Sequence, residues 1–271
     1  MNRNMSDIYS HTLPVERQGE TAHRYMLGVY SLLERLTQKF PHVLLEGCAG
    51  GGGRFDAGML AYCPQIWCSD NTDAVERLSI QYGTSFGYPV SAMGAHVSAC
   101  PNHQTGRTTP LGTRAVVAMS GTFGYELDLN TLSEAECQEV SSQIARFIRW
   151  NSLIQTGRLY RLVAPAPHHD FTAWQFVSPD QTESLLNVVI THPRSNGTFP
   201  HVTVRGLDPQ VQYCLDEVVF TGCHNIPDSS SVRCGVRQGM VYSGSFLLHA
   251  GLTLPKFFGD YPAVQLHFTK V

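Results

Sequence analysis

Residues 64–80 read PQIWCSDNTDAVERLSI, and the order of apolar and polar residues in this stretch indicates the class of fold. Pro64–Trp67 is a short apolar run of the kind that forms a buried strand. The polar segment after it contains Asp70, and either Asn71 or Thr72 can cap the helix that the next residues predict. A strand, a loop that carries an acid and a helix, in that order, form the repeating unit of a (β/α) barrel.

The same alternation of short apolar runs and helical patterns extends over the first 156 residues. Besides the strand and helix above, we expect a helix over Glu20–Phe40, a strand at Val43–Leu45, short apolar runs near Phe86–Val90 and Val116–Met119, and a helix that reaches about Ile154. Ser133 and Glu136 have the spacing of a capping box at the start of that last helix. A whole (β/α)8 barrel takes about 250 residues, so residues 1–156 are predicted to hold about half of a TIM barrel.

Residues 157–271 have a different pattern, in which short apolar runs are separated by turn residues. The strands that we expect there are Tyr160–Ala164, Ala173–Ser178, Ser184–Thr191, His201–Arg205, Gln210–Leu215, Glu217–Thr221, Ser245–His249 and Val264–Phe268. Such a series predicts an antiparallel β-sandwich. We therefore place a domain boundary between residues 156 and 157, with α/β structure before it and all-β structure after it.

Composition and charge argue against several classes of protein. Among 271 residues, 19 Lys and Arg stand against 22 Asp and Glu, and the net charge of −3 argues against a nucleic-acid binder. No run approaches the ~20 apolar residues of a membrane span, and Met1–Ser10 is too polar for the core of a secretion signal. We therefore expect no nucleic-acid partner and no membrane partner. The location stays open between the cytoplasm and the cell exterior.

The sequence holds one candidate for a metal or disulfide cluster. None of the eight cysteines lies in a Cys-x-x-Cys pair, and no His-x-x-x-His or His-Glu-x-x-His motif occurs. Cys214, Cys223, His224 and Cys234 lie close together in the sequence and could form such a cluster. The competing interpretation is that the cysteines are free thiols in and around strands, as is common for this small apolar residue.

Asp70 is the first candidate for catalytic chemistry, since the active site of a barrel lies at the carboxyl ends of its strands. The neighbouring Trp67 offers an apolar face to a sugar ring and can shield the carboxyl from water, as a general acid requires. The competing interpretation is that Asp70 or Asp73 only caps the following helix. Asp73, in the first turn of that helix, is expected to compensate the helix dipole. The residues alone leave both interpretations of Asp70 open.

A glycine-rich loop follows the strand that is expected at Val43–Leu45. It spans Cys48–Asp56 and reads CAGGGGRFD. Glycines let a backbone approach a ligand closely, which favours a binding loop. A phosphate-binding loop is an alternative, although the Gly-Lys-Ser/Thr ending and the full Gly-x-Gly-x-x-Gly spacing are missing. A flexible turn without a binding role is the other alternative.

Taken together, these segments resemble the α-galactosidases of glycoside hydrolase family 36. The resemblance covers almost all of residues 1–157. It rests on blocks that occur in the family's order, among them Glu46–Asp56, Pro64–Asp73, Met93–Ser98, Pro101–Gln104 and Phe123–Leu127. Residues 157–271 are more loosely similar to the family's C-terminal β-domain. The resemblance thus implies the C-terminal half of a TIM barrel followed by an antiparallel β-sandwich.

The resemblance also implies a retaining glycosidase, which uses two carboxylates to release terminal α-linked galactose from sugars such as melibiose and raffinose. Asp70 matches the acid/base of that pair. The residues that match substrate-binding positions are Cys48, Gly50, Gly51 and Trp67. Arg54 and Asp56 are implied as supports of the glycine loop. The implied partners are α-galactoside oligosaccharides, and no metal or organic cofactor is implied.

One part of the family pattern falls outside the chain. The family nucleophile is the Asp of a Lys-Trp-Asp-Met-Asn-Arg segment, and the chain begins with Met1-Asn2-Arg3. Because retention needs two carboxylates about 5 Å apart, we expect little or no turnover from the isolated chain. Two alternatives stay open, a non-catalytic sugar-binding remnant and one half of a split barrel. An open barrel edge also predicts self-association into a homo-oligomer.

Overall fold

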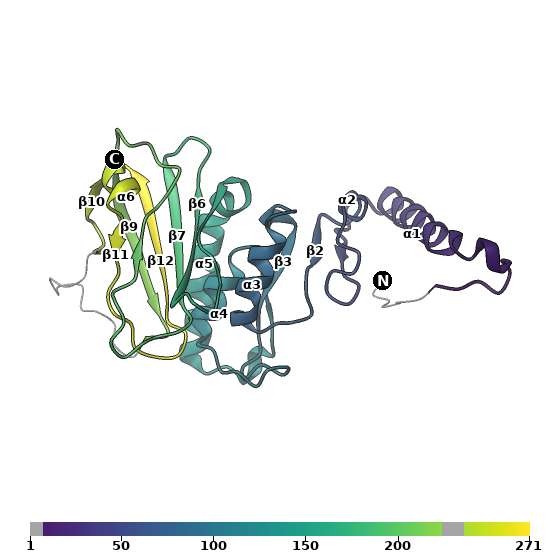
Figure 1. The fold of residues 1–271 in the computed structure, drawn as a ribbon, viewed down its shortest axis with the longest axis horizontal. Helices are drawn as coiled ribbons and strands as arrows, with labels where there is room; N and C mark the ends of the chain where they lie inside the picture. Colours follow the sequence, from purple (N-terminus) through teal and green to yellow (C-terminus); the bar gives the residue numbers. More distant parts are fainter. Residues whose placement is uncertain (1–7, 224–235) are drawn as a thin grey trace. The chain divides into compact units, whose positions relative to one another are not determined.

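The computed structural model describes residues 8–223 and 236–271, which Figure 1 follows from helix α1 to strand β12. The chain divides into two compact units, Met1–Asn71 with Ala92–Gly94 and Thr72–Ser91 with Ala95–Val271. The secondary structure changes elsewhere, because helix α5 (Glu134–Thr156) ends immediately before Gly157 and the following segments are strands. That residues 156 and 157 also separate two domains stays a prediction.

The first unit consists of short strands and helices around a small core. In chain order they are 3-10 helix η1 (Val15–Arg17), helix α1 (Glu20–Lys39), strand β1 (Glu46–Gly47), helix α2 (Ala57–Leu60) and strand β2 (Gln65–Trp67). Strands β1 and β2 pair in parallel, and β2 also pairs in parallel with the first residues of β3 (Met93–Ser98). Helix α1 confirms the prediction over Glu20–Phe40 and ends before Pro41, which lacks the N–H that a further turn needs.

The strand expected at Val43–Leu45 was placed wrongly, since β1 begins only after this run. Val43 and Leu44 are exposed, Leu44 to 85%, and only Leu45 of this run packs against the core of the first unit. The strand forms instead where Gly47 leaves room for the side chain of Ile66 on β2. A Cβ on Gly47 would lie 3.1 Å from Ile66 Cγ1 of β2. Close pairing with β2 therefore sets the position of β1, rather than local hydrophobicity.

The second unit begins with alternating helices and strands. These are helix α3 (Ala74–Thr84), the remainder of β3, helix α4 (Leu111–Ala118), strand β4 (Thr122–Glu126), 3-10 helix η3 (Leu129–Thr131) and α5. In the order of the sheet, β4 is next to β3. The capping box predicted for α5 is confirmed, because the side chains of Ser133 and Glu136 each accept a hydrogen bond from the other residue's backbone N–H.

Two apolar runs that precede strands are not strands themselves. The run near Phe86–Val90 lies in a turn that leads to 3-10 helix η2 (Val90–Ala92), and the strand is formed by β3 after it. Most of Val116–Met119 lies in helix α4, where three of its residues are buried. An apolar run this short fits a buried strand and a buried helix equally well, so the sequence could not separate them.

The rest of the second unit is antiparallel. A six-stranded sheet has the order β10 (Val241–Ser243), β9 (Gln212–Thr221), β12 (Ala263–Lys270), β7 (Glu183–Ile190), β6 (Phe171–Val177) and β5 (Arg158–Val163), and a second sheet pairs β11 (Leu252–Thr253) with β8 (His201–Val202). Helix α4 lies against β12, and α5 lies against β6 and β7 (Figure 1). Trp150 of α5 stacks on His267 of β12 with ring centroids 5.5 Å apart.

The strand predictions for this part hold with three exceptions. Of the strand expected at His201–Arg205, only His201–Val202 is a strand, β8. Gln210–Leu215 and Glu217–Thr221 form one strand, β9, which has an irregularity in its register with β12. The strand expected at Ser245–His249 is wrong, because this segment is helix α6 (Gly244–His249). Ser243 starts the helix by accepting a hydrogen bond from Phe246 N at 3.1 Å. Within the described ranges, none of the helices combines the length and hydropathy of a membrane span.

Candidate active site

The glycine-rich loop of the first unit packs its backbone directly on the end of strand β2. Gly50, Gly51 and Gly52 have φ values of +60°, +64° and +102°, in the region that glycine alone adopts at little cost. A Cβ on Gly51 would lie 2.1 Å from the backbone N of Asp70 and 2.5 Å from the carbonyl carbon of Ser69. Both the backbone conformation and the lack of space therefore require glycine at position 51.

Asp70 follows this contact and is exposed. From the start of the glycine loop, Cys48 Sγ donates a long hydrogen bond of 4.0 Å to Asp70 Oδ1. The carboxyl of Asp70 does not cap the following helix, because the N-cap of α3 is Asp73, which accepts from Val75 N at 2.8 Å. The structure thus places the carboxyl of Asp70 after the C-terminal end of β2, where it is accessible to solvent and does not cap a helix.

Asp73 makes more contacts than a helix cap requires. It is 2% exposed, and its carboxylate accepts hydrogen bonds from Thr105 Oγ1 and from Arg107 Nη1, the latter at 2.6 Å. Burial by itself raises the pKa of Asp73, but the hydrogen bonds from Thr105 and Arg107 outweigh it and hold the pKa below its ordinary value. The expectation that Asn71 or Thr72 caps this helix was wrong, whereas the alternative that Asp73 caps it is confirmed. The long-range partners fix Asp73 in the capping position.

Trp67 lies inside the first unit. It is 7% exposed, and its ring meets strand β3, where a Cβ on Gly94 would be 3.0 Å from Trp67 Cε3. The sequence suggested that this indole shields the carboxyl of Asp70 from water. Because Asp70 is exposed while Trp67 is packed against β3, the described residues do not provide that shielding.

Arg54 and Asp56 connect the glycine loop to helix α1. Arg54 Nη2 donates to the carbonyl of Cys48 at 3.3 Å, and Arg54 Nη1 lies 3.5 Å from Tyr25 Oη. Asp56 is the N-cap of α2 and accepts a hydrogen bond from Tyr30 Oη at 3.0 Å. Burial and then the hydrogen bond to Asp56 raise the pKa of Tyr30, which keeps it a donor. The sequence did not predict the two tyrosines, since they look like ordinary core positions of an amphipathic helix.

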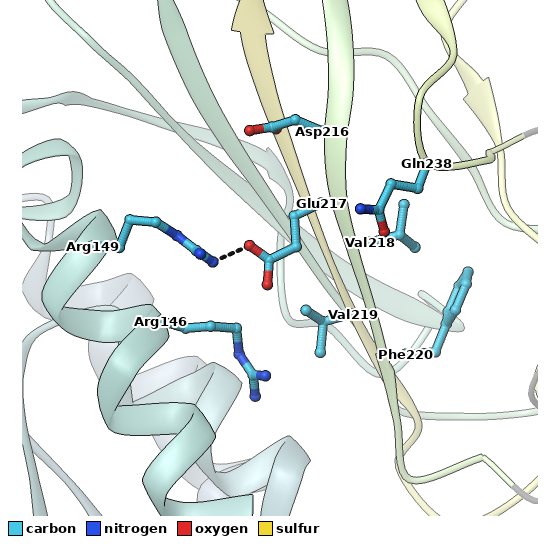
Figure 2. A pocket seen from close by; sticks show the side chains of 8 residues that line it. All are labelled: Arg146, Arg149, Asp216, Glu217, Val218, Val219, Phe220 and Gln238. Carbon is cyan, nitrogen blue, oxygen red and sulfur yellow. Dashed lines mark hydrogen bonds and ion pairs between the residues drawn. The ribbon is translucent and has the colours of Figure 1, made fainter.

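A separate cavity of about 630 Å³ lies in the second unit, between helix α5 and strand β9. Figure 2 shows Arg149 reaching from α5 to the carboxylate of Glu217 on β9, with which it forms an ion pair. The other carboxylate of the lining, Asp216, pairs with His267 Nδ1 at 2.8 Å. Both carboxylates are thus held in contacts within the unit, and this cavity is distinct from the site at Asp70.

The candidate metal or disulfide cluster receives no support from the part of the chain that the structure describes. Within that part, no three His, Cys, Asp or Glu side chains are grouped so that they could hold a metal ion. Cys214 and Cys223 are unbridged thiols. The other two members of the cluster, His224 and Cys234, lie outside the described residues.

Comparison with known proteins gives two family matches and close relatives. Residues 1–157 match the Melibiase family, and residues 171–268 match the glycosyl hydrolase family 36 C-terminal domain. The bifunctional α-galactosidase/sucrose kinase AgaSK of Mediterraneibacter gnavus is 48% identical over 271 residues, which are 100% of this chain and 26% of AgaSK.

Solved structures give the same result. Crystal structures of variants of the α-galactosidase AgaA from Geobacillus stearothermophilus, one in complex with raffinose and one with stachyose, match with TM-scores of 0.85 and 0.86 at 45% and 46% sequence identity. These matches cover 99% and 100% of this chain and 35% of each AgaA chain. The chain therefore spans about a third or less of the length of these relatives. The predicted fold, part of a TIM barrel followed by an antiparallel β-domain, is confirmed.

Proposed function

The chain belongs to glycoside hydrolase family 36, and from that membership we propose that it supplies the acid/base and the galactose-binding loop of a retaining α-galactosidase. The reaction is the release of terminal α-linked galactose from oligosaccharides such as melibiose and raffinose. The observation that carries the proposal is the exposed carboxyl of Asp70 at the end of β2, beside Cys48 and the glycine loop. The ends of parallel strands are where a barrel holds its catalytic groups.

Asp70 moves one proton in each of the two steps of retention. In the first step, it donates its proton to the glycosidic oxygen while a second carboxylate attacks the anomeric carbon, so that the leaving sugar departs as an alcohol. In the second step, the carboxylate of Asp70 takes a proton from water while the water oxygen displaces the second carboxylate from the anomeric carbon. The exposure of Asp70 gives both the leaving sugar and the water access to it.

Galactose recognition is assigned to the glycine loop and to its neighbour on β2. The residues proposed for it are Cys48, Gly50, Gly51 and Trp67. A loop of glycines with positive φ brings backbone hydrogen-bonding groups close to a ligand without interposed side chains, which suits a neutral sugar rich in hydroxyls. Arg54 and Asp56 keep this loop in place through α1. The AgaA complexes with raffinose and stachyose support α-galactoside oligosaccharides as the substrate class.

The second carboxylate is proposed to come from outside these 271 residues. The resemblance places this carboxylate in the family's Lys-Trp-Asp-Met-Asn-Arg segment, of which this chain contains only Met1-Asn2-Arg3. A retaining enzyme needs its two carboxyl groups about 5–5.5 Å apart. The isolated chain is therefore expected to bind galactose and to hydrolyse galactosides slowly or not at all.

Calorimetric titration with galactose and hydrolysis of an aryl α-galactoside test this proposal on the purified chain. We expect galactose binding that Cys48→Ala weakens and that Asp260→Asn leaves unchanged, since Asp260 is an exposed carboxyl of the other unit. Absence of galactose binding contradicts the proposed site. Substantial hydrolysis that survives Asp70→Asn contradicts the assigned acid/base, whereas hydrolysis that Asp70→Asn abolishes places a nucleophile within the chain.

A further inference from the structure

We propose that Gly51 and Gly52 are positioning residues for Asp70, because the loop that faces galactose on one side fixes the acid/base on its other side by packing backbone on backbone. This inference rests on the proposed function, in which Asp70 transfers the proton. It adds that sugar recognition and proton transfer depend on one shared element. A change on the loop then alters the chemical step as well as the binding of the sugar.

The contacts of the two glycines cover the three residues that end with Asp70. A Cβ on Gly51 would lie 2.6 Å from Ser69 Cα and 2.1 Å from Asp70 N, and a Cβ on Gly52 would lie 2.8 Å from the carbonyl oxygen of Cys68. All three distances are below 3.0 Å, and real Cβ atoms essentially never come that close to another heavy atom. The atoms in the way belong to the backbone and cannot turn aside as a side chain would. Any side chain at Gly51 must therefore move either the loop or the end of β2.

The glycine loop is held by hydrogen bonds within itself and by contacts with α1. A side chain added at Gly51 is therefore expected to displace the residues after β2 rather than the loop. Gly53 N donates to the carbonyl of Ala49 at 3.0 Å and closes the loop as a turn. Arg54 donates to the carbonyl of Cys48 at 3.3 Å, and its Nη1 lies 3.5 Å from Tyr25 Oη of α1. The contact from Cys48 Sγ to the carboxyl of Asp70 is long, 4.0 Å, and offers little resistance to a shift of that carboxyl. Asp70 is the part that moves.

Displacement of an acid/base has a specific kinetic consequence. A misplacement of about 1 Å can lower a rate by about 100-fold. The loss affects both proton transfers of Asp70, but only the transfer to the leaving group depends on which substrate is hydrolysed. The sugar that leaves melibiose requires that proton, whereas dinitrophenolate is a stable anion and departs without it. A loop that had lost only its galactose contacts would instead lower the hydrolysis of both substrates alike.

The first test compares Gly51→Ala with Gly106→Ala in the full chain. Gly106 has a similar positive φ, +69° against +64° for Gly51, but nothing lies within 4 Å of its Cβ position. The readout is the 13C signal of the Asp70 carboxyl, assigned by its loss in Asp70→Asn, so that no turnover is needed. We expect Gly51→Ala to shift this signal and Gly106→Ala to leave it unchanged. An unchanged signal in a folded Gly51→Ala chain overturns the inference.

A second variant separates packing from backbone strain. Asparagine tolerates the left-handed conformation better than alanine does, yet it carries a Cβ. If packing is the cause, Gly51→Asn shifts the Asp70 carboxyl signal as Gly51→Ala does. A return of the wild-type signal in Gly51→Asn overturns the inference in favour of strain. Should Gly51→Ala fail to fold, Gly51→Asn and Gly52→Ala provide the same comparison.

Hydrolysis provides the functional readout wherever turnover is measurable. We expect Gly51→Ala to lower kcat/KM on melibiose about 100-fold more than kcat/KM on dinitrophenyl α-galactoside. This ratio reports the steps through departure of the leaving group and excludes the water step, which is common to both substrates. Equal losses on the two substrates overturn the inference. Failure of the proposed function would look different, because galactose would then leave the Asp70 carboxyl signal of the wild-type chain unchanged, whatever the glycine variants do.

Discussion

Asp70 and Asp73 lie in one short segment and have opposite surroundings. The carboxyl of Asp70 is exposed at the end of β2, with Cys48 beside it. The carboxyl of Asp73 is buried under Thr105 and Arg107, which follow it by 32 and 34 residues. Since these partners are distant in the sequence, local patterns could not tell which aspartate would cap the helix. The difference in surroundings is what leaves Asp70 available for chemistry.

The ion pair of Asp73 with Arg107 makes stability depend on pH. The pKa of Asp73 in the folded chain lies below its ordinary value, so its contribution is fully present above the unfolded pKa of about 3.9 and is lost as the pH falls through the folded pKa. Asp73→Asn keeps a capping side chain but loses the ion pair. We expect it to lower the free energy of unfolding by about 1–3 kcal/mol at pH 7 and to weaken its dependence on pH in the acid range.

Urea unfolding at a series of pH values between 7 and the acid limit of the native state measures this effect. Asp128→Asn is the control, because Asp128 caps the exposed 3-10 helix η3 without an ion pair among the described contacts. An Asp73→Asn chain as stable as the wild type at pH 7 would contradict the role given to the ion pair.

At the scale of elements, helix α5 shows which features a sequence can specify. Its capping box joins Ser133 to Glu136, and both signals lie within one turn of the chain. Segment Ser245–His249 follows a capping serine, Ser243, but has no capping box, and its few apolar residues fitted a strand as well as the helix that forms. The contact of Gly51 with Asp70 joins two separate loops and could not be predicted from either one. The site residues came from the family resemblance, whereas their packing came from the structure.

The capping box predicts the effect of a single substitution on α5. Ser133→Ala removes the hydroxyl that accepts from Glu136 N, and loss of such a cap costs about 1 kcal/mol. Equilibrium unfolding in urea measures the change. Ser141→Ala, at an exposed position of the same helix, is expected to change the free energy of unfolding by less than about 0.5 kcal/mol. Equal effects of the two substitutions would contradict the assignment of the cap.

At the scale of the whole molecule, the two units have cores of very different size. One buried cluster of the first unit comprises Val29, Met59, Cys63 and Ile66, with partly buried residues around them. The second unit contains a much larger cluster, which includes the apolar faces of β6, β7, β9 and β12. Local stability follows the amount of buried apolar surface. The site at Asp70 therefore belongs to the less stable unit.

This difference predicts the pattern of hydrogen exchange. We expect the amides of α1 to exchange faster than those of β7 and β12 in the free chain. Galactose at about 100 times its Kd should stabilise the unit that binds it by up to about 2.7 kcal/mol, and the added protection should appear in the first unit. Hydrogen exchange measured by mass spectrometry, with and without galactose, shows which of the two units gains protection. Protection confined to the second unit would contradict a galactose site at the glycine loop.

The assignment of Asp70 as the acid/base can be decided by a crystal structure of the chain with galactose. We expect the sugar against the glycine loop, with its anomeric oxygen within about 3.2 Å of a carboxyl oxygen of Asp70, the reach required for proton transfer. Galactose bound elsewhere, such as in the cavity between α5 and β9, or bound at the loop with Asp70 out of reach of that oxygen, would contradict the assignment.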